Sequence, residues 1–487
     1  MGIKKFTLLH SNDMHGDFFA EAQGAPGNLI GGLSLLSGYI RRVRREEENV
    51  IFVIAGDMVQ GSMIDSEFKG ISTIEIMNYL APDVVSLGNH ELDYGLPHLL
   101  FLEKMANFPI VNANMYIKKY NRRLMRPHLV LEVDGYSILF IGILTETVLQ
   151  SLKRDASIAT FISLTEAASE VGRICNAYKD LNIDLTVLLT HIGFESDKEL
   201  ARLLDPAWGI DLIIGGHTHT ILDQPASVNN VLITQAGVGT DQVGRFDLMV
   251  DDVTNQIVEW KWQLIPITNQ LAEPDADLQK FIDSFKEVVD RKYNVMLCRF
   301  AQPLTHPHRE QETAMGNLFA DIFAETQRID VILLGSGSLR ANTLGPLVTL
   351  GELYRVFAYD DALNRFTITG AQLKKIFAHI MRPENRNSEG ECFQVNRGVR
   401  AAYNNATRTL ETLMVNNAPV QDDHTYTLGL QGFHVKNAEQ NIGLTNAELE
   451  AHAGSHVATT SLRDVLEEYL RAHQNLNSQV EGRLEYK

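Results

Sequence analysis

The sequence predicts a two-domain α/β protein, with a larger domain over residues 1–270, a linker helix over 271–297 and a smaller α/β domain over 298–487. Three observations predict it. Up to about residue 250, short apolar runs alternate with helical patterns, which is typical of βαβ units. A polar segment with helical spacing follows, and a second set of strand and helix patterns then begins. The 487 residues suit two to four domains of about 100–200 residues each.

Six short apolar runs in the first domain are expected to be strands. They cover residues 6–9, 51–55, 84–87, 110–113, 184–189 and 211–214. Helices are expected between them, over 32–47, 71–80, 96–107, 164–179 and 198–204. Asp134 and Gly135 separate two alternating runs and predict a type I′ hairpin. Because residues 243–267 also look like antiparallel strands, the sheet is expected to be mixed.

The polar stretch over residues 273–293 is expected to form the linker helix. It opens with Pro274 and places Leu278, Phe281, Phe285 and Val288 at helical spacing. The alternative is a packed helix inside one large domain. In the second domain we expect helices over 313–327, 371–381 and 461–473, and strands near 331–334, 366–369, 410–415 and 426–430.

Composition excludes several classes of protein. Hydrophobic residues make up 45% and charged residues 21%, which is ordinary for a soluble globular protein and excludes a disordered chain. No uninterrupted apolar stretch reaches the length of a transmembrane helix. The net charge of −18 argues against binding a nucleic-acid polymer or an anionic membrane. A small phosphorylated substrate is still compatible, because local cations can reverse the field in one cleft.

The cysteines and the N-terminus say little about chemistry. Cys175, Cys298 and Cys392 are far apart and lack CxxC spacing, so neither a disulfide framework nor a cysteine zinc site is indicated. The N-terminus has no long apolar segment followed by a cleavage site, so we expect a cytoplasmic protein. A signal peptide that had already been removed would leave the same pattern. No pattern indicates an obligate protein partner.

Metal-type side chains follow five of the predicted strands. They are Asp13 and His15, Asp57, Asn89, His191, and His217 with His219. Ligands in α/β sheets bind outside the carboxyl ends of strands, so these side chains can converge at one edge. Taken singly, a histidine after a strand is more often a satisfied polar residue, and we expect His10 to point into the core. Together, the seven side chains indicate a metal centre.

The types of ligand narrow the choice of metal. Imidazole, carboxylate and amide oxygen suit Zn, Mn, Fe or Co rather than Ca, and the absence of thiolates argues against a structural zinc. Seven ligands are too many for one ion and suit two divalent metal ions that share a bridging carboxylate. Two metals about 3.5–4 Å apart can hold a hydroxide between them and stabilise an in-line phosphoryl displacement.

The motifs Asp13-x-His15, Gly56-Asp57, Gly88-Asn89-His90-Glu91, His191 and Gly216-His217-x-His219 resemble those of the calcineurin-like metallophosphoesterases. The longer forms, residues 13–16 and 89–93, resemble the 5′-nucleotidase family of two-domain bacterial type. The resemblance implies a layered α/β/β/α first domain and a substrate-binding second domain. It implies one metal on Asp13, His15, Asp57 and His219, and a second on Asn89, His191, His217 and the bridging Asp57. His90 would stabilise the transition state, oriented by Asp93.

In the second domain, the resemblance implies a substrate site. Arg309 and Arg340 would bind phosphate through their planar forks, and Tyr359 and Phe433 would sandwich a nucleobase. The plain alternatives are surface arginines and core aromatic residues. Family members have a ribose-binding Asp in a glycine-rich loop just after the second ring. Residues 436–443 contain no Asp, so Glu439 or an amide would have to replace it, or the substrate is not a simple ribonucleotide.

The sequence therefore predicts a metal-dependent phosphohydrolase, a 5′-nucleotidase acting on nucleoside monophosphates through a hydroxide held between two metals. The alternatives in the same class are a nucleotide-sugar or dinucleotide pyrophosphatase and a 2′,3′-cyclic nucleotide phosphodiesterase. An alternative of another class is a catalytically silent metal- or nucleotide-binding protein. The presence of all seven presumed ligands and of the His90–Asp93 pair argues against a silent protein.

Overall fold

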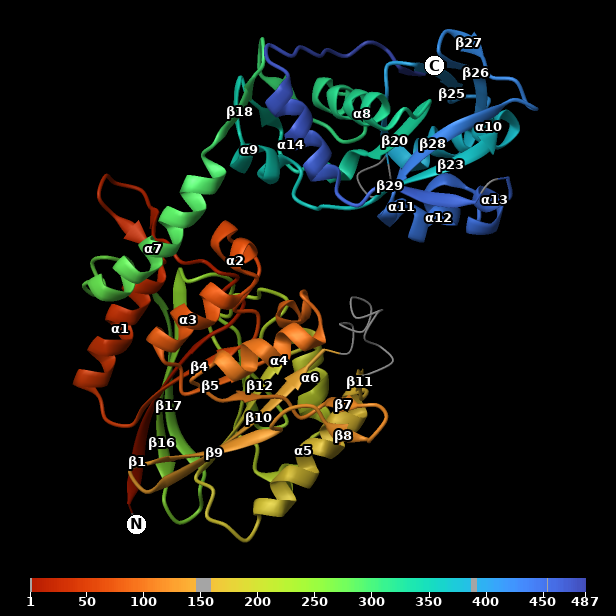
Figure 1. Cartoon of the computed structure of the whole chain (residues 1–487). Helices are drawn as coiled ribbons and strands as arrows, with labels where there is room; N and C mark the ends of the chain where they lie inside the picture. The colour runs from red at the N-terminus through yellow and green to blue at the C-terminus, as the bar shows by residue number, and fades with distance from the viewer. Residues whose placement is uncertain (1, 146–158, 387–391, 453) are drawn as a thin grey trace. The chain divides into compact units, whose positions relative to one another are not determined.

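The computed structural model describes residues 2–145, 159–386, 392–452 and 454–487 (Figure 1). The chain divides into two compact units, residues 1–289 and 290–487. Among the described residues, no helix is both long enough and apolar enough to cross a membrane.

Unit 1 contains two six-stranded sheets. The first runs in the order β17 (Ile257–Pro266), β16 (Gln242–Asp251), β1 (Ile3–Ser11), β4 (Val50–Ala55), β5 (Val84–Ser86) and β6 (Ile110–Val111). Strands β1, β4, β5 and β6 are parallel, whereas β16 and β17 are antiparallel. The sheet is therefore mixed, as expected.

The second sheet runs in the order β14 (Ala226–Val228), β15 (Val231–Thr234), β13 (Leu212–Ile214), β12 (Leu185–His191), β10 (Tyr136–Leu144) and β9 (His128–Val133). Between β9 and β10, Asp134 has φ 47° and Gly135 has φ 79°. Positive φ at both positions defines the predicted type I′ turn, which is confirmed. One apolar core joins the two sheets, with Phe6 on β1 and Phe140 on β10 among its members.

Helices cover the outer faces of both sheets. Helix α1 (Leu33–Glu46) contacts β4 and, with α3 (Ile71–Leu80) and α4 (Leu96–Met105), covers the first sheet (Figure 1). Helices α5 (Leu164–Tyr178) and α6 (Phe194–Leu203) pack on the second sheet, where Val171 and Leu200 join Leu139 and Ile213 in one cluster. The layered α/β/β/α architecture is therefore confirmed.

Two helices of unit 1 differ from expectation, and in unit 2 the short helices over Leu350–Val356, Gly432–Lys436, Ala438–Ile442 and Asn446–Glu450 were not predicted. Helix α6 begins at Phe194 rather than at residue 198, because Gly193 turns the chain at φ 90° and acidic side chains in the first turn favour the helix start. Helix α2 (Met63–Phe68) was not predicted. The Ser62 side chain accepts a hydrogen bond from the Asp65 N–H and caps this short helix. The remaining short strands of unit 1 are β2 (Glu21–Ala22), β3 (Leu29–Ile30), β7 (Met115–Ile117), β8 (Arg122–Arg123) and β11 (Ala159–Phe161).

The expected linker helix is α7 (Ala276–Tyr293), and as far as Val289 it belongs to unit 1. It begins after Pro274, where the buried Asp275 side chain accepts the Leu278 N–H at 3.2 Å. The Phe285 ring packs edge-on against Phe68 with ring centroids 5.3 Å apart. Most of this helix is therefore packed against unit 1.

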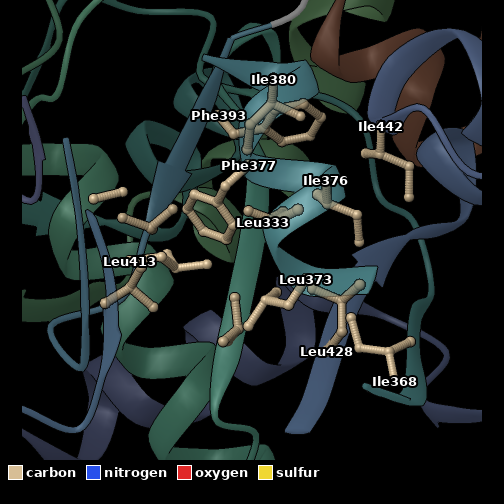
Figure 2. Close-up of a cluster of buried hydrophobic side chains, with 14 of the residues drawn as sticks. Leu333, Ile368, Leu373, Ile376, Phe377, Ile380, Phe393, Leu413, Leu428 and Ile442 are labelled. Carbon is tan, nitrogen blue, oxygen red and sulfur yellow. The ribbon is translucent and has the colours of Figure 1, made fainter. Parts of the chain in front are cut away.

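Unit 2 contains a five-stranded and a four-stranded sheet. The first runs in the order β24 (Phe393–Val395), β20 (Val331–Gly335), β28 (Thr425–Gln431), β23 (Leu363–Thr369) and β29 (Ser455–Thr459). The second runs β27 (Ala418–Pro419), β26 (Thr409–Val415), β25 (Val399–Asn404) and β30 (Leu484–Tyr486). Figure 2 shows the core, in which Ile376 and Phe377 of α10 (Gly370–Ile380) lie with Leu333 and Leu413 from the two sheets.

The other main helices of unit 2 are α8 (Ala314–Gln327) and α14 (Leu462–Ala472), both close to the predicted ranges. Shorter elements complete the unit: β18 (Met296–Arg299), β19 (Leu304–Thr305), β21 (Thr343–Leu344), β22 (Leu347–Thr349), α9 (Leu350–Val356), α11 (Gly432–Lys436), α12 (Ala438–Ile442) and α13 (Asn446–Glu450).

Candidate active site

The structure brings the presumed ligands of unit 1 together. They follow β1, β4, β5, β12 and β13, which come from both sheets. Three groups have potential ligand atoms within 4.8 Å of one another: Asp13, His15 and His219; Asp13, Asp57 and His191; and His15, Asp57 and His90. Because Asp13 and Asp57 each occur in two of these groups, the groups form one continuous cluster.

Backbone hydrogen bonds fix the loops after β1 and β4 beside each other. The N–H groups of Asp13, His15 and Gly16 donate to the carbonyls of Gly56, Asp57 and Met58 at 3.1, 3.0 and 2.9 Å. The parallel pairing of the two strands thus continues into the loops that carry the acidic side chains.

Two glycines are required by the crowding at the cluster. A Cβ at Gly56 would lie 2.6 Å from His191 Nδ1, and a Cβ at Gly88 would lie 2.1 Å from Asp57 Oδ1. Gly56 also has φ 77°, a conformation that other residues rarely adopt. Side chains at these positions would displace the presumed ligands.

Asp57 lies between the other groups, where a bridging carboxylate is expected. Its Oδ2 lies 3.0 Å from His191 Nε2 and 4.0 Å from His15 Nε2, and its Oδ1 accepts the His90 N–H at 2.9 Å. Burial raises the pKa of Asp57, but the charge and hydrogen bond of His191, together with the charge and backbone N–H of His90, outweigh burial and lower the pKa to about 2. Asp57 is therefore a carboxylate over the whole physiological pH range.

His191 tests whether a cation fits this site. Its Nδ1 donates to the Ala55 carbonyl at 2.8 Å, so Nε2 is the ring nitrogen that faces the cluster. Nε2 is buried and lies 3.0 Å from Asp57 Oδ2 and 3.7 Å from Asp13 Oδ1. Burial lowers the pKa of His191, but the two carboxylates raise it to about 9. The two carboxylates therefore favour positive charge at Nε2, which either a proton or a metal ion supplies. The donor set therefore fits a metal ion.

His15 is oriented in the same way by a backbone carbonyl. Its Nδ1 donates to the Gln60 carbonyl at 3.0 Å, so Nε2 faces His219 Nε2, 3.1 Å away. The fully buried Asp65 accepts the Gln60 N–H at 2.8 Å and so fixes this loop. Asp65 was not predicted from the sequence. A single acidic residue in a polar segment does not indicate that it supports a metal ligand, even when it lies close to a helix cap such as Ser62.

Asn89, His191 and His217 form the other side of the cluster. His217 Nδ1 lies 2.7 Å from Asn89 Oδ1, and the rings of His191 and His217 are 5.3 Å apart. The His217 N–H donates to Asp13 Oδ2 at 2.9 Å. These contacts place the three side chains where the second set of ligands is expected.

A buried polar pair holds the turn that carries His217 and His219. Gln235 Nε2 donates to the Gly216 carbonyl at 3.2 Å and to Asp197 Oδ2 at 3.1 Å. Burial raises the pKa of Asp197 to about 7. Neither Gln235 nor Asp197 was predicted. Gln235 bonds to a backbone carbonyl, and Asp197 bonds to Gln235, which is distant from it in sequence.

The Glu91 side chain links the loop after β4 to the loop after β5. Its buried carboxylate accepts the N–H groups of Asp57, Met58 and Gly88 at 3.0, 2.8 and 2.6 Å. Burial raises the pKa of Glu91 to about 7. The sequence motif included Glu91, but its role as a brace between loops was not predicted.

His90 pairs with Asp93, as the spacing allows. The His90 Nδ1 lies 2.6 Å from Asp93 Oδ2, and this hydrogen bond raises the pKa of His90 to about 9. The imidazole is then positively charged at neutral pH. Because His90 also lies within ligand distance of His15 and Asp57, its role as a non-ligand stays a prediction.

His10 lies in the core, as expected. It is fully buried, and its ring stacks on Trp262 with centroids 5.4 Å apart. Burial lowers its pKa to about 3. His10 is therefore neutral and stands apart from the cluster.

Three of the four predicted substrate residues in unit 2 surround one turn. Arg340 Nη1 donates to the Gly337 carbonyl at 3.4 Å, and its guanidinium lies 5.6 Å above the Tyr359 ring. Arg309 lies over the same turn, where a Cβ at Gly337 would come within 2.9 Å of its Nη2. The two arginines and Tyr359 are thus close together.

Phe433 reaches the same region through β28. Gln431 at the end of β28 donates to Ser338 Oγ at 2.9 Å, and Phe433 follows two residues later. Tyr359 is 63% exposed and Phe433 is 55% exposed. The alternative that they are core aromatic residues is therefore wrong.

Residues 436–443, which contain no Asp, run from the end of α11 through α12. The Asn437 side chain donates to the Phe433 carbonyl at 2.9 Å, so it supports the ring-bearing turn. Glu439 is exposed and lines a shallow pocket with Lys436 and Asn437. Whether Glu439 or an amide binds a sugar stays a prediction.

Two family comparisons agree with this division of the chain. Residues 6–220 match the calcineurin-like phosphoesterase family, and residues 294–444 match the 5′-nucleotidase C-terminal domain. The fold and the two matches define a phosphate-ester hydrolase. The chain belongs to the calcineurin-like metallophosphoesterases of the 5′-nucleotidase family.

Known relatives are distant in sequence. Endonuclease YhcR of Bacillus subtilis is 24% identical over 456 residues, which covers 88% of this chain but 36% of the relative. This chain thus spans about a third of that protein. The mouse 5′-nucleotidase is 24% identical over 537 residues, covering 99% of this chain and 90% of the relative. The 5′-nucleotidase precursor of Thermus thermophilus has the same fold, with a TM-score of 0.66, 22% identity and 99% of both chains covered.

Proposed function

We propose that this chain is a metal-dependent 5′-nucleotidase that hydrolyses nucleoside monophosphates. The observation that carries the proposal is the convergence of the seven presumed ligands of unit 1, five in groups within ligand distance and Asn89 and His217 in contact with them, beside the His90–Asp93 pair. One metal is assigned to Asp13, His15, Asp57 and His219, and the second to Asn89, His191, His217 and Asp57. Mn, Zn, Fe and Co are the candidate metals.

When bound, two divalent ions supply an activated water and stabilise negative charge on the phosphoryl oxygens. The residues of the chain complete this chemistry. The positively charged His90 donates a hydrogen bond to a phosphoryl oxygen, and Asp93 fixes the direction of its ring at 2.6 Å. The hydrogen bond from His90 becomes stronger as negative charge develops on the phosphoryl oxygen in the transition state. It therefore accelerates the reaction and does more than bind the substrate.

Unit 2 supplies recognition in this proposal. The arginine forks suit phosphate or another acidic group of the substrate. The exposed Tyr359 and Phe433 rings suit stacking on a nucleobase, which contributes roughly 1–3 kcal/mol per base and tolerates different bases. A metal centre alone would hydrolyse many small phosphate esters, so selectivity is assigned to unit 2.

A second candidate is the hydrolysis of a nucleotide sugar, a dinucleotide or a 2′,3′-cyclic nucleotide. It is favoured by the absence of an Asp in residues 436–443 and by the presence of two arginines, which suit a diphosphate. The net charge of −18 weighs against a nucleic-acid polymer or a membrane as a partner. A cytoplasmic location stays a prediction. Turnover of AMP, a nucleotide sugar and a cyclic nucleotide, with identified products, separates these substrates.

The test of base stacking compares AMP with p-nitrophenyl phosphate, which has no base. The double variant Tyr359→Ala/Phe433→Ala should lower kcat/KM for AMP by an amount equivalent to roughly 2–6 kcal/mol, since each ring contributes about 1–3 kcal/mol. Its kcat/KM for p-nitrophenyl phosphate should hardly change. Equal losses on both substrates would show that the rings have a structural role only.

A further inference from the structure

The two exposed rings of unit 2 are not held in place by burial. Tyr359 is 63% exposed and Phe433 is 55% exposed, so packing restricts neither ring in the way that it restricts a core residue. Their separation must then depend on the backbone segments that carry them. Those segments are the loop before β23 and the first turn of α11, which follows β28.

One side chain joins these two segments. Asp361, two residues after Tyr359, accepts the Phe433 N–H at 2.7 Å with Oδ2 and the Ala362 N–H at 2.8 Å with Oδ1. The Gly432 N–H donates to the Ala362 carbonyl at 2.9 Å beside it. The carboxylate therefore links the loop that bears one ring directly to the residue that bears the other.

The residues around Asp361 leave room for its carboxylate and anchor its backbone. A Cβ at Gly432 would lie 2.5 Å from Asp361 Oδ1, so only glycine lets the carboxylate approach the turn so closely. The Asp361 carbonyl accepts the Leu462 N–H at 3.1 Å, which anchors the loop to the start of α14. Asp360 makes a separate anchor, because its Oδ1 accepts the Arg463 N–H at 3.1 Å and does not bond to Phe433.

From these contacts we infer that Asp361 is a positioning residue that sets the separation of Tyr359 and Phe433 and thereby the selectivity for a nucleobase. This inference rests on the proposed function, in which the two rings sandwich the base. Asp361 acts through the Phe433 backbone and not on the substrate. Its loss should raise KM for a nucleotide and leave the hydrolytic step unchanged.

The experiment measures kcat and KM for AMP and for p-nitrophenyl phosphate in wild type and Asp361→Ala. We expect kcat/KM for AMP to fall about tenfold through KM, because a hydrogen bond to a charged group is worth about a factor of ten or more. For p-nitrophenyl phosphate, kcat/KM should stay within about twofold. Asp361→Asn should be intermediate, because an amide has one acceptor oxygen for two N–H groups.

Two further variants separate positioning from a general loosening of the loop. Asp360→Ala removes the neighbouring anchor to α14 and should leave both substrates within about twofold. Adding Asp361→Ala to Phe433→Ala should cause no further loss on AMP, because there is no longer a ring to position. Losses that simply add, or equal losses on both substrates, would overturn the inference.

The substrate preference of the wild-type protein distinguishes failure of the inference from failure of the proposed function. If wild type shows no preference for AMP over p-nitrophenyl phosphate, and the ring variants change nothing, the proposed function and the inference both fail. If the ring variants abolish the preference but Asp361→Ala and Asp361→Asn preserve it, the inference alone is wrong. Thermal melting of each variant checks that the fold is retained.

Discussion

Two buried histidines of unit 1 show how surroundings decide chemistry at the scale of single residues. His10 and His191 both lie at or near the end of a strand and both are fully buried. His191 faces two carboxylates, which attract positive charge to its Nε2. His10 faces Trp262, and neither of its ring nitrogens bonds to a described residue. The same residue type therefore serves a presumed metal site in one place and apolar packing in the other.

The buried His10 should make the protein sensitive to acid. Its pKa is about 3 in the folded state and about 6.5 when exposed, so the unfolded state binds more protons between these values. The free energy of unfolding should then fall by about 1.4 kcal/mol per pH unit below about pH 6.5. His10→Leu should lack this contribution, which amounts to about 2 kcal/mol by pH 5. Urea unfolding at pH 7.5 and pH 5 measures it, and an unchanged pH dependence would contradict the account.

A variant of His90 tests whether this residue is a metal ligand or a catalytic residue. His90→Ala should keep both metals and lower kcat by roughly 10²–10³-fold, which is typical of losing one group that stabilises the transition state. Metal content per chain and kcat are measured on the same preparation. If the variant loses a metal, His90 is a ligand and its proposed role is wrong.

The presumed ligands were predictable because each follows an apolar strand directly. Asp65, Glu91, Asp197 and Gln235 were not, because their role is to bond to backbone groups or to other side chains. Glu91, for example, accepts from N–H groups on either side of a gap of about thirty residues. Such hydrogen bonds depend on how closely two loops approach each other in the fold. A sequence pattern does not reveal that approach.

At the scale of elements, helices with clear periodicity were predicted best. Helix α3 has the predicted bounds, because glycine begins it and a left-handed residue ends it. The short strands of unit 2, such as β24 and β30, were missed. Each has three residues and pairs with a distant segment, so neither length nor alternation marks it.

Strand β30 is fixed to unit 2 by a buried charge. Arg483 is fully buried, and its two terminal nitrogens each donate to Asp321 on α8 at 2.8 Å. Its Nη1 also donates to the Val395 carbonyl at 2.7 Å. This buried ion pair therefore joins the residue that precedes β30 to α8 and to the end of β24.

Arg483→Ala should destabilise unit 2 by about 3–5 kcal/mol, because Asp321 loses its fully buried partner and keeps, among the described residues, only the exposed Arg397 beside it. The matched control is Arg471→Ala on α14, whose partner Glu467 forms an exposed pair, and this variant should change stability by less than about 1 kcal/mol. Chemical unfolding of both variants compares them. Equal effects would show that the buried pair does not anchor β30.

At the scale of the whole molecule, the chain separates two tasks. The presumed metal ligands and the His90–Asp93 pair lie in unit 1, whereas the arginines and the exposed rings lie in unit 2. The layered fold of unit 1 could be predicted because its strands and helices alternate regularly. The substrate could not, because it depends on the geometry of exposed side chains and on a loop that departs from the family pattern.

The central claim is that the clustered side chains of unit 1 hold two metal ions that are required for phosphate release. The most direct measurement follows AMP hydrolysis and metal content together, before chelation, after chelation and after adding back Mn, Co or Zn. The account predicts that activity disappears with the metal and returns as about two ions per chain are restored. Full activity in metal-free protein would contradict it.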